Sequence, residues 1–383
     1  KTQRTDMGNG FCVEVVAVLG VPGSSMYASE LIPEASGGVR PMKAIACFIS
    51  LSVLLLLSGC GEKTSTTSAT TPKPAPGAPT AKPKKITIGL VAKANANQVF
   101  QVAKTAAEAT AKDRGAKEGI EIVVDWRTPE VENAIEQARN IEALANTCDG
   151  ISVSCSDGDK LAGPITAAVD KGVPVMTFDS DSPNSKRFCY FGTDDAALGK
   201  RLVQELVSVM GDKGVVGILA GNQNAPNLKK RVDACREELK KHPNIKLAGP
   251  TNGAFYHDET GQAAAAAWAS AQNANPEITG WVLVGGWPLF TQGATKALGE
   301  PGKVKVVSCD ALPAMLAYLR DGSVQVLVAQ DLWGWGAQSV NILTDKIVHN
   351  KTPEKFVYGE LTRVSKDNVE EYAKKWEQWA PTK

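Results

Sequence analysis

The stretch "ITIGLVAKANANQVFQVAKTAAEATAKD", residues 86–113, opens the pattern that decides the fold. Its first seven residues, 86–92, form a continuous apolar run of the kind seen in fully buried strands. A polar loop at 93–97 separates this run from a helix-like segment. A strand that is buried on both sides needs helices on both faces of its sheet, so the stretch predicts an α/β fold with a parallel sheet.

The same alternation continues to about residue 330. The segments between the apolar runs have apolar residues spaced by three and four, as at Ile135, Ala138, Ile141 and Leu144, which predicts helices. The runs form two sets of five, at 86–92, 120–126, 150–154, 173–179 and 188–194, and then at 215–221, 245–250, 280–286, 304–310 and 324–330. Two sets of this size predict two similar α/β lobes rather than one large sheet.

Composition and short motifs narrow the function classes. The chain has 383 residues, of which 43% are hydrophobic and 22% charged, as in ordinary soluble proteins of about two domains. A net charge of +1 gives no electrostatic case for nucleic acid as a partner. The sequence has no HExxH or CxxC, no GxGxxG after its first strand, no P-loop and no GxSxG. We therefore expect no metal, no cofactor and no catalytic residue.

Eight cysteines are spaced too irregularly for a disulfide framework. They are Cys12, Cys47, Cys60, Cys148, Cys155, Cys189, Cys235 and Cys309. Our interpretation is that they are small buried apolar residues. One disulfide among Cys148, Cys155 and Cys189 is the alternative, because all three lie near predicted strand ends.

The segment 42–59 is typical of a signal peptide. Lys43 precedes an uncharged run of 14 residues, Ala44 to Leu57, which is short for the roughly 20 apolar residues of a membrane span. Leu57-Ser58-Gly59-Cys60 then resembles the bacterial lipobox, in which the cysteine is lipidated. We expect Cys60 to carry a lipid anchor; a buried strand or short helix that happens to end in cysteine is the alternative.

The regions on either side of this signal follow from its position. Residues 1–41 would be upstream sequence from a mis-set start, with Met42 as the initiator, or else a genuine extension. Residues 61–83, rich in Ser, Thr and Pro, cannot form a core and are expected to be a solvated linker behind Cys60. The globular part is expected to begin near Lys84.

Polar and aromatic residues follow the predicted strands where these end. Asp179 and Asp181 follow one strand, Trp287 another, and Asp310 and Gln330 end the last two. Ligands of open parallel sheets bind beyond the carboxyl ends of the strands. Carboxylates and amides there can bind hydroxyl groups, and an aromatic ring can pack on a sugar face. Each of these residues could also be a helix N-cap or a rim aromatic.

Residues 86–364 resemble the periplasmic sugar-binding proteins of ABC importers, of the ribose-binding type. The stretch 86–113 is similar to the family's first strand, ligand loop and first helix. The stretches 149–200 and 306–336 are similar to its second half-lobe and its final strand–helix–strand. The resemblance implies ligand-binding roles for Lys93, Asn97, Phe100, Asp179, Lys229, Tyr256, Asp310 and Gln330.

Three departures set this chain apart from the ribose binders. Gly286 and Trp287 stand where the family usually has Asn-Asp, Ser180 replaces an arginine, and Val99 stands where an aromatic residue is common. We therefore expect a ligand bound outside the ribose pattern. A pyranose, deoxysugar or polyol packed on Trp287 is our hypothesis.

The resemblance also implies a mechanism. A sugar or polyol would enter a cleft between hinge-linked lobes, and the closed monomer would dock on the membrane subunits of an ABC permease. The first lobe would comprise 84–194 and 331–358, and the second 195–330 with the tail 359–383. One alternative is a sensor lipoprotein of the same fold that presents its ligand to a chemoreceptor or histidine kinase. Another is a sugar-active enzyme using Asp179 and Asp181.

Overall fold

The computed structural model describes residues 83–250 and 253–379. The expectations for residues 1–82, including the signal peptide and the lipidated Cys60, lie outside the described residues. All described residues belong to one compact unit.

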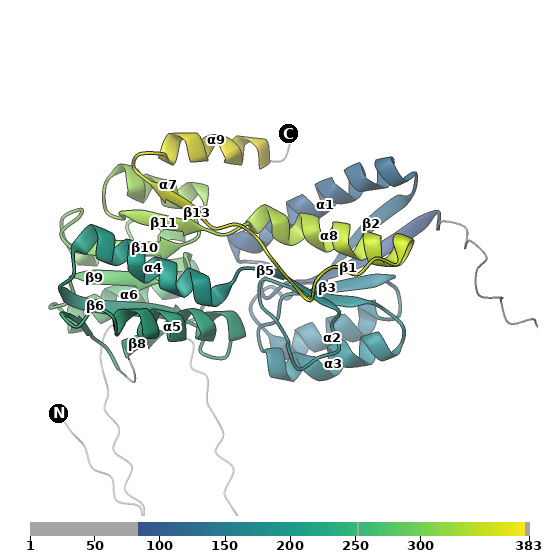
Figure 1. The fold of residues 1–383 in the computed structure, drawn as a ribbon, viewed down its shortest axis with the longest axis horizontal. Helices are drawn as coiled ribbons and strands as arrows, with labels where there is room; N and C mark the ends of the chain where they lie inside the picture. Colours follow the sequence, from purple (N-terminus) through teal and green to yellow (C-terminus); the bar gives the residue numbers. More distant parts are fainter. Residues whose placement is uncertain (1–82, 251–252, 380–383) are drawn as a thin grey trace, which may run out of the picture. The chain divides into compact units, whose positions relative to one another are not determined.

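A first sheet of six parallel strands has the order β12-β5-β4-β3-β1-β2 (Figure 1). Its strands are β1 Lys85–Val91, β2 Glu121–Trp126, β3 Gly150–Val153, β4 Val175–Phe178, β5 Cys189–Gly192 and β12 Phe356–Tyr358. Helices α1 Gln98–Glu118 and α8 Leu332–His349 cover one face, and α2 Ala134–Leu144 and α3 Gly158–Asp170 cover the other. Strand β1 contributes to the apolar clusters on both faces of this sheet. Ile88 belongs to the cluster on the α1 side and Val91 to the cluster on the α2 side.

A second sheet has the order β13-β11-β10-β9-β6-β7, with β8 also paired to β6. Its strands are β6 Gly214–Gly221, β7 Ile245–Leu247, β8 Ala254–Tyr256, β9 Gly280–Leu283, β10 Lys305–Cys309, β11 Val326–Ala329 and the antiparallel β13 Thr362–Ser365. The helical elements around it are α4 Asp195–Met210, α5 Pro226–Leu239, α6 Gly261–Ala274, η2 Trp287–Phe290, η3 Lys296–Leu298, α7 Pro313–Arg320 and α9 Val369–Trp379. The prediction of two α/β lobes with parallel sheets between helices is confirmed.

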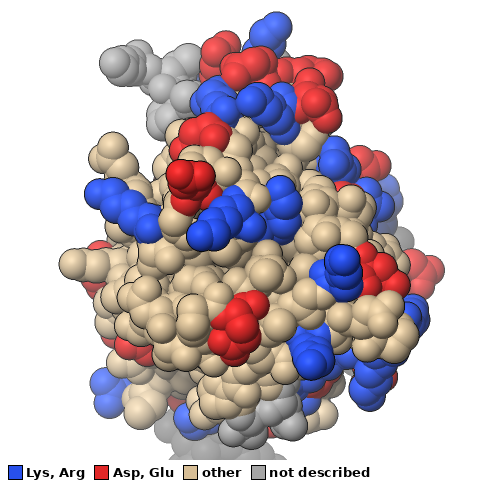
Figure 2. Space-filling view, turned by 90° about the vertical axis from the view of Figure 1, so that its left-hand side faces the viewer, with Lys and Arg blue, Asp and Glu red and all other residues tan. Residues whose placement is uncertain are grey.

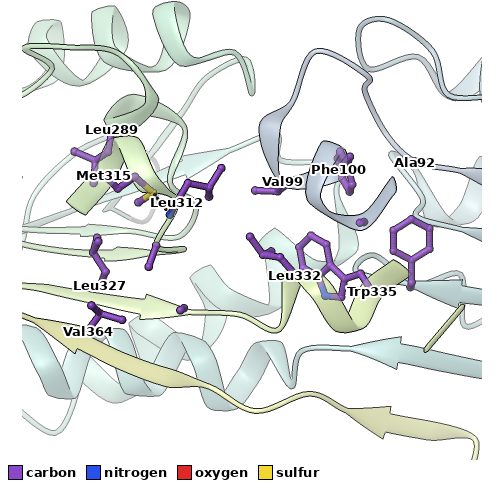
Figure 3. Packing of buried hydrophobic residues seen from close by; sticks show 14 of the residues in the cluster. Ala92, Val99, Phe100, Leu289, Leu312, Met315, Leu327, Leu332, Trp335 and Val364 are labelled. Atoms are coloured by element: carbon purple, nitrogen blue, oxygen red, sulfur yellow. Dashed lines mark hydrogen bonds between the residues drawn. The ribbon is translucent and has the colours of Figure 1, made fainter. Parts of the chain in front are cut away.

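The polypeptide passes between the two sheets at three places in its described part. These are the links from β5 to α4, from β11 to α8 and from β12 to β13. Buried apolar side chains from both sheets belong to one cluster; Figure 3 shows Val99, Phe100, Leu332 and Trp335 from α1 and α8, with residues of the second sheet's layer beyond them. On the face that is on the left in Figure 1, charges of both signs are interspersed (Figure 2).

The sequence analysis did not predict three short strands. β8 and β12 have three residues each and β13 has four, and several of their side chains are exposed. Such segments lack the continuous apolar run that revealed the longer buried strands.

The cysteines of the described residues are free and buried, as the main interpretation predicted. A disulfide among Cys148, Cys155 and Cys189 is therefore wrong. Cys148 precedes β3 and Cys155 follows it, so a strand of about 13 Å separates them, whereas bridged Cα atoms lie within about 7 Å. Cys189 belongs to the apolar cluster on the opposite face of the sheet.

Gly336 sets how closely α8 approaches α1. A Cβ atom at this position would overlap with the backbone carbonyl oxygen of Ala103, which cannot move without shifting α1. We predict that Gly336→Ala lowers the free energy of unfolding by about 2–4 kcal/mol, measured by urea denaturation.

Gly163→Ala is the matched control, because Gly163 is exposed in α3 and a Cβ atom there meets nothing within 4 Å. This change should alter the free energy of unfolding by less than about 1 kcal/mol, because the higher helix propensity of Ala is opposed by Pro164, which disfavours a Cβ atom on the preceding helical residue. Equal stabilities for the two variants would contradict the close helix contact.

Candidate functional site

A cavity of about 780 Å³ is lined by loops that belong to both sheets. From the first sheet come the loop after β1, with Lys93 and Asn97, and Val131 and Glu132 before α2. From the second come the loop after β6, the loop 256–261 between β8 and α6, and Phe290 and Thr291 at η2. The loops that follow β1, β6 and β8 start at carboxyl ends of parallel strands, where ligands of this fold class bind.

Lys93 is buried beside this cavity and forms a hydrogen-bonded chain that joins the two lobes. Its Nζ donates to Asn227 Oδ1 at 3.2 Å, and Asn227 Nδ2 donates to Asp179 Oδ1 at 3.2 Å. Ser154 Oγ donates to the other oxygen of Asp179 at 2.6 Å. Burial works against the ammonium ion, but the carboxylates of Glu259, Asp179 and Glu132 outweigh it and raise the pKa of Lys93.

Asp310 and Gln330 form a second polar cluster. Gln330 Nε2 donates to Asp310 Oδ1 at 2.7 Å, while Gln330 Oε1 accepts from Arg231 Nη2 at 2.7 Å and from Thr193 Oγ1 at 2.8 Å. Arg231 also forms a buried ion pair with Asp195, with Nε 2.8 Å from Oδ1. Burial raises the pKa of Asp195 to about 6 although Arg231 opposes this shift. These residues satisfy one another and do not line the cavity.

Asp179 and Asp310 take the same unusual backbone conformation directly after β4 and β10. Their φ angles are 55° and 67°, in the left-handed region that few residues other than Gly, Asn and Asp adopt. The equivalent turn in both lobes explains why aspartate follows each of these strands in the sequence.

Asp181 is held by protein groups on both carboxylate oxygens. Arg187 binds it through Nε to Oδ1 and Nη2 to Oδ2, each at 2.6 Å, and Thr177 Oγ1 also donates to Oδ1 at 2.6 Å. This pair is almost fully buried. These contacts show that Asp181 fixes the loop after β4.

Two of the three aromatic residues predicted to contact the ligand, Phe100 and Trp287, lie inside the protein. Phe100 is 2% exposed and packs against Phe178 and Trp335, with ring centroids 6.4 Å and 6.0 Å away (Figure 3). Trp287 is 6% exposed and its ring centroid lies 5.6 Å from that of His257. Neither ring lines the cavity in this structure.

The structure brings Lys93, Asn97 and Tyr256 to the cavity wall. Asn97 also caps α1, because its Oδ1 accepts from the backbone N–H of Val99 at 3.2 Å. Lys229 lies elsewhere: its side chain is 69% exposed and its Nζ is 2.5 Å from Asp233 Oδ2 one helical turn along α5.

The sequence analysis missed several polar cavity residues, among them Glu132, Asn222, His257 and Glu259. Asn222 Nδ2 donates to Glu132 Oε1 at 3.0 Å, which joins a loop of the first sheet to one of the second. Asn222 could have been found, since it directly follows the predicted strand 215–221. His257 and Glu259 follow β8, whose three residues give no strand signal.

Glu259 and His257 each have a buried polar atom that lacks a hydrogen-bond partner among the described residues, Oε1 and Nε2 respectively. Burial raises the pKa of Glu259 to about 7; Lys93 opposes this shift, and Glu132 and Asp179 add to it. Burial also lowers the pKa of His257, although the carbonyl of Asp258 accepts from its ring at 2.9 Å. Both residues line the cavity.

Within the described ranges, no group of three or more His, Cys, Asp or Glu side chains is placed to hold a metal ion. None of the helices described is both long enough and apolar enough to cross a membrane.

The chain belongs to the periplasmic binding proteins: a family model described as periplasmic binding protein domain matches residues 88–351. Among curated relatives, the D-ribose/D-allose-binding protein of Pseudomonas aeruginosa is 27% identical over 284 residues, which cover 71% of this chain and 85% of the relative. The xylitol-binding protein of Mycolicibacterium smegmatis is 26% identical over 189 residues, covering 49% of this chain and 53% of the relative.

Solved structures of other proteins have the same fold. An ABC transporter solute-binding protein from Burkholderia graminis, solved with D-arabinose, is 25% identical with a TM-score of 0.69 and matches 75% of this chain and 98% of its own. The XylFII molecule is 26% identical with a TM-score of 0.66, over 74% of this chain and 100% of its own, and it has also been solved in a XylFII–LytSN complex.

The position of Glu259 predicts a pH dependence of stability. Its carboxyl group has a pKa of about 7 in the folded protein against an ordinary value of 4.5, so the folded state binds the proton more tightly. Glu259 therefore lowers stability progressively as pH rises from about 4.5 to 7. We predict that the free energy of unfolding of Glu259→Gln, relative to that of the unaltered protein, increases by up to about 3 kcal/mol from pH 5 to pH 8.

Urea denaturation of both proteins at the two pH values measures this gain. Asp195 titrates in both proteins, so its contribution cancels in the difference. A difference in stability that stays constant from pH 5 to pH 8 would show that Glu259 is ionised normally.

Proposed function

We propose that this protein is an extracytoplasmic binding protein that captures a sugar or polyol between its lobes and delivers it to the permease of an ABC importer. The cavity between loops of the two sheets is the observation that carries the proposal. Its wall combines carboxylates, amides and an ammonium group with the rings of Tyr256 and Phe290, the mixture expected for a polyhydroxylated ligand. Relatives named for ribose, allose, xylose, arabinose and xylitol binding support the ligand class.

Capture would depend on contacts between lobes that form and break. Glu132–Asn222 and Lys93–Asn227 join loops of the two lobes through hydrogen bonds, and both pairs lie at the cavity or directly beside it. A ligand that binds the closed arrangement better than the open one shifts the population toward closure. No covalent chemistry is needed, and only the closed form would present a complete surface to the permease.

A sensor is the second candidate. XylFII, which has the same fold and 26% identity, has been solved in a complex with LytSN. A sensor lipoprotein that presents its ligand to a receptor would use the same cavity but a different membrane partner.

A thermal-shift screen of pentoses, hexoses, deoxysugars, polyols and amino acids tests the ligand class. A ligand at about 1,000 times its Kd should raise the free energy of unfolding by about 4 kcal/mol. Stabilisation by amino acids alone would overturn the sugar proposal. Uptake of the labelled ligand then separates the two functions, because a strain that lacks the gene should lose uptake for a transporter and keep it for a sensor.

Two variants locate the binding site within that experiment. Asn97→Ser keeps an oxygen that can cap α1 but removes the amide, so we expect affinity to fall by roughly fivefold with little change in Tm. Lys229→Ala removes an exposed group outside the cavity and should change affinity less than twofold. The reverse order of effects would place the ligand at α5 and away from the cavity.

We also propose that Cys60 anchors the protein to the membrane through a lipid. The motif Leu57-Ser58-Gly59-Cys60 and the linker behind it are the supporting observations. Replacing Cys60 by Ser should move the protein from the membrane fraction to the soluble fraction, measured by fractionation and blotting. An unchanged membrane fraction would show that the cysteine is not the anchor.

A further inference from the structure

Carboxylates outnumber cations around the cavity. Glu259, Glu132 and Asp179 all act electrostatically on Lys93, which is the cation of the cavity wall within the described residues. Arg231 also acts electrostatically on Glu259, but it is already paired with Asp195, with Nε 2.8 Å from Oδ1. When all four groups are ionised, three carboxylates against one ammonium group leave a net charge of −2.

Neither Glu259 nor Glu132 has a cation within ion-pair distance in the part of the chain that the structure describes. Glu132 accepts one hydrogen bond from the neutral amide of Asn222. Glu259 Oε1 is buried in the cavity wall without a hydrogen-bond partner there. A charge removed from water is normally paired, so the Glu259 carboxylate is incomplete without a further cation.

The loop positions explain why the protein itself does not supply that cation. Glu132 precedes α2 in the first lobe and Glu259 precedes α6 in the second, so they face the cavity from opposite sides. The ammonium group of Lys93 donates to Asn227 and is held there. Burial of Glu259 beside the other carboxylates raises its pKa, as expected for a carboxyl group that has too little positive charge nearby.

We propose that the ligand is a polyhydroxylated amine whose ammonium group binds between Glu259 and Glu132. This inference rests on the proposed function and narrows its substrate class. An ammonium group offers three donors, no acceptor and a full charge, so it satisfies both carboxylates, whereas a hydroxyl group offers one donor and no charge. The amides of Asn97 and Asn222 then remain for the hydroxyl groups, and Tyr256 and Phe290 for the apolar face of the ligand.

Isothermal titration calorimetry of two ligand pairs tests the proposal on the unaltered protein. The pairs are D-glucitol with 1-amino-1-deoxy-D-glucitol, and D-glucose with 2-amino-2-deoxy-D-glucose; they distinguish an amino-polyol from an aminosugar. In at least one pair the amine should bind roughly ten- to hundredfold more tightly than its hydroxyl analogue. This preference should disappear in Glu259→Gln.

Glu277→Gln is the matched control, because it makes the same chemical change at an exposed position of the second lobe outside the cavity. It should keep the full preference for the amine. If Glu259→Gln does not fold, as judged by circular dichroism, Glu132→Gln replaces it and should also reduce the preference.

Neutral partners that bind as tightly as the amines, or more tightly, would overturn the inference and leave the proposed function standing. An amine preference that survives both Glu259→Gln and Glu132→Gln would also overturn it. Absence of binding for both members of both pairs, together with a thermal-shift screen without sugar hits, would overturn the proposed function as well.

Discussion

The hydrogen-bonded chain Lys93–Asn227–Asp179 is the interaction around which the site is organised. It starts in the loop after β1, crosses to the first turn of α5 in the second lobe, and returns to the residue after β4. Two parallel sheets place Lys93 and Asp179 directly beyond the ends of their strands, and this contact joins them to α5 of the other lobe. A buried ammonium ion is unfavourable alone, and neighbouring carboxylates keep it charged.

Around this chain, the polar groups fall into two kinds. Asp181 with Arg187, and Gln330 with Arg231, Thr193 and Asp310, have their hydrogen bonds completed by protein atoms. Such networks fix loop geometry, since removing one partner would leave a buried polar group unpaired. Glu259 and His257 are of the other kind, because each lines the cavity and has a buried polar atom without a partner among the described residues.

The sequence was a good guide wherever burial was complete. Strand β4 is fully buried, and β1 and β10 nearly so; continuous apolar runs therefore revealed them, and the polar residue that follows each could be located. The sequence did not predict β8, because three partly exposed residues give no strand pattern. The cavity residues 257–261, which follow β8, were therefore not recognised as part of the site. The sequence also did not show which of two nearby cations on α5 is buried. The side chain of Lys229 is 69% exposed, whereas that of Arg231, two residues later, is 3% exposed. Which of them faces the interior depends on the packing of α5 against α4, which one sequence does not specify.

The unequal treatment of similar carboxylates is the clearest physical sign of a binding site here. Asp181 and Glu259 both lie in loops at carboxyl ends of strands, and a fold selected for stability alone would pair both of them. Asp181 has a guanidinium group 2.6 Å away, while Glu259 has a buried oxygen with no partner among the described residues and a pKa raised to about 7. Unpaired buried groups are unfavourable for folding, and they persist where a ligand completes them. The residues that destabilise the free protein are therefore the ones that best define what it binds.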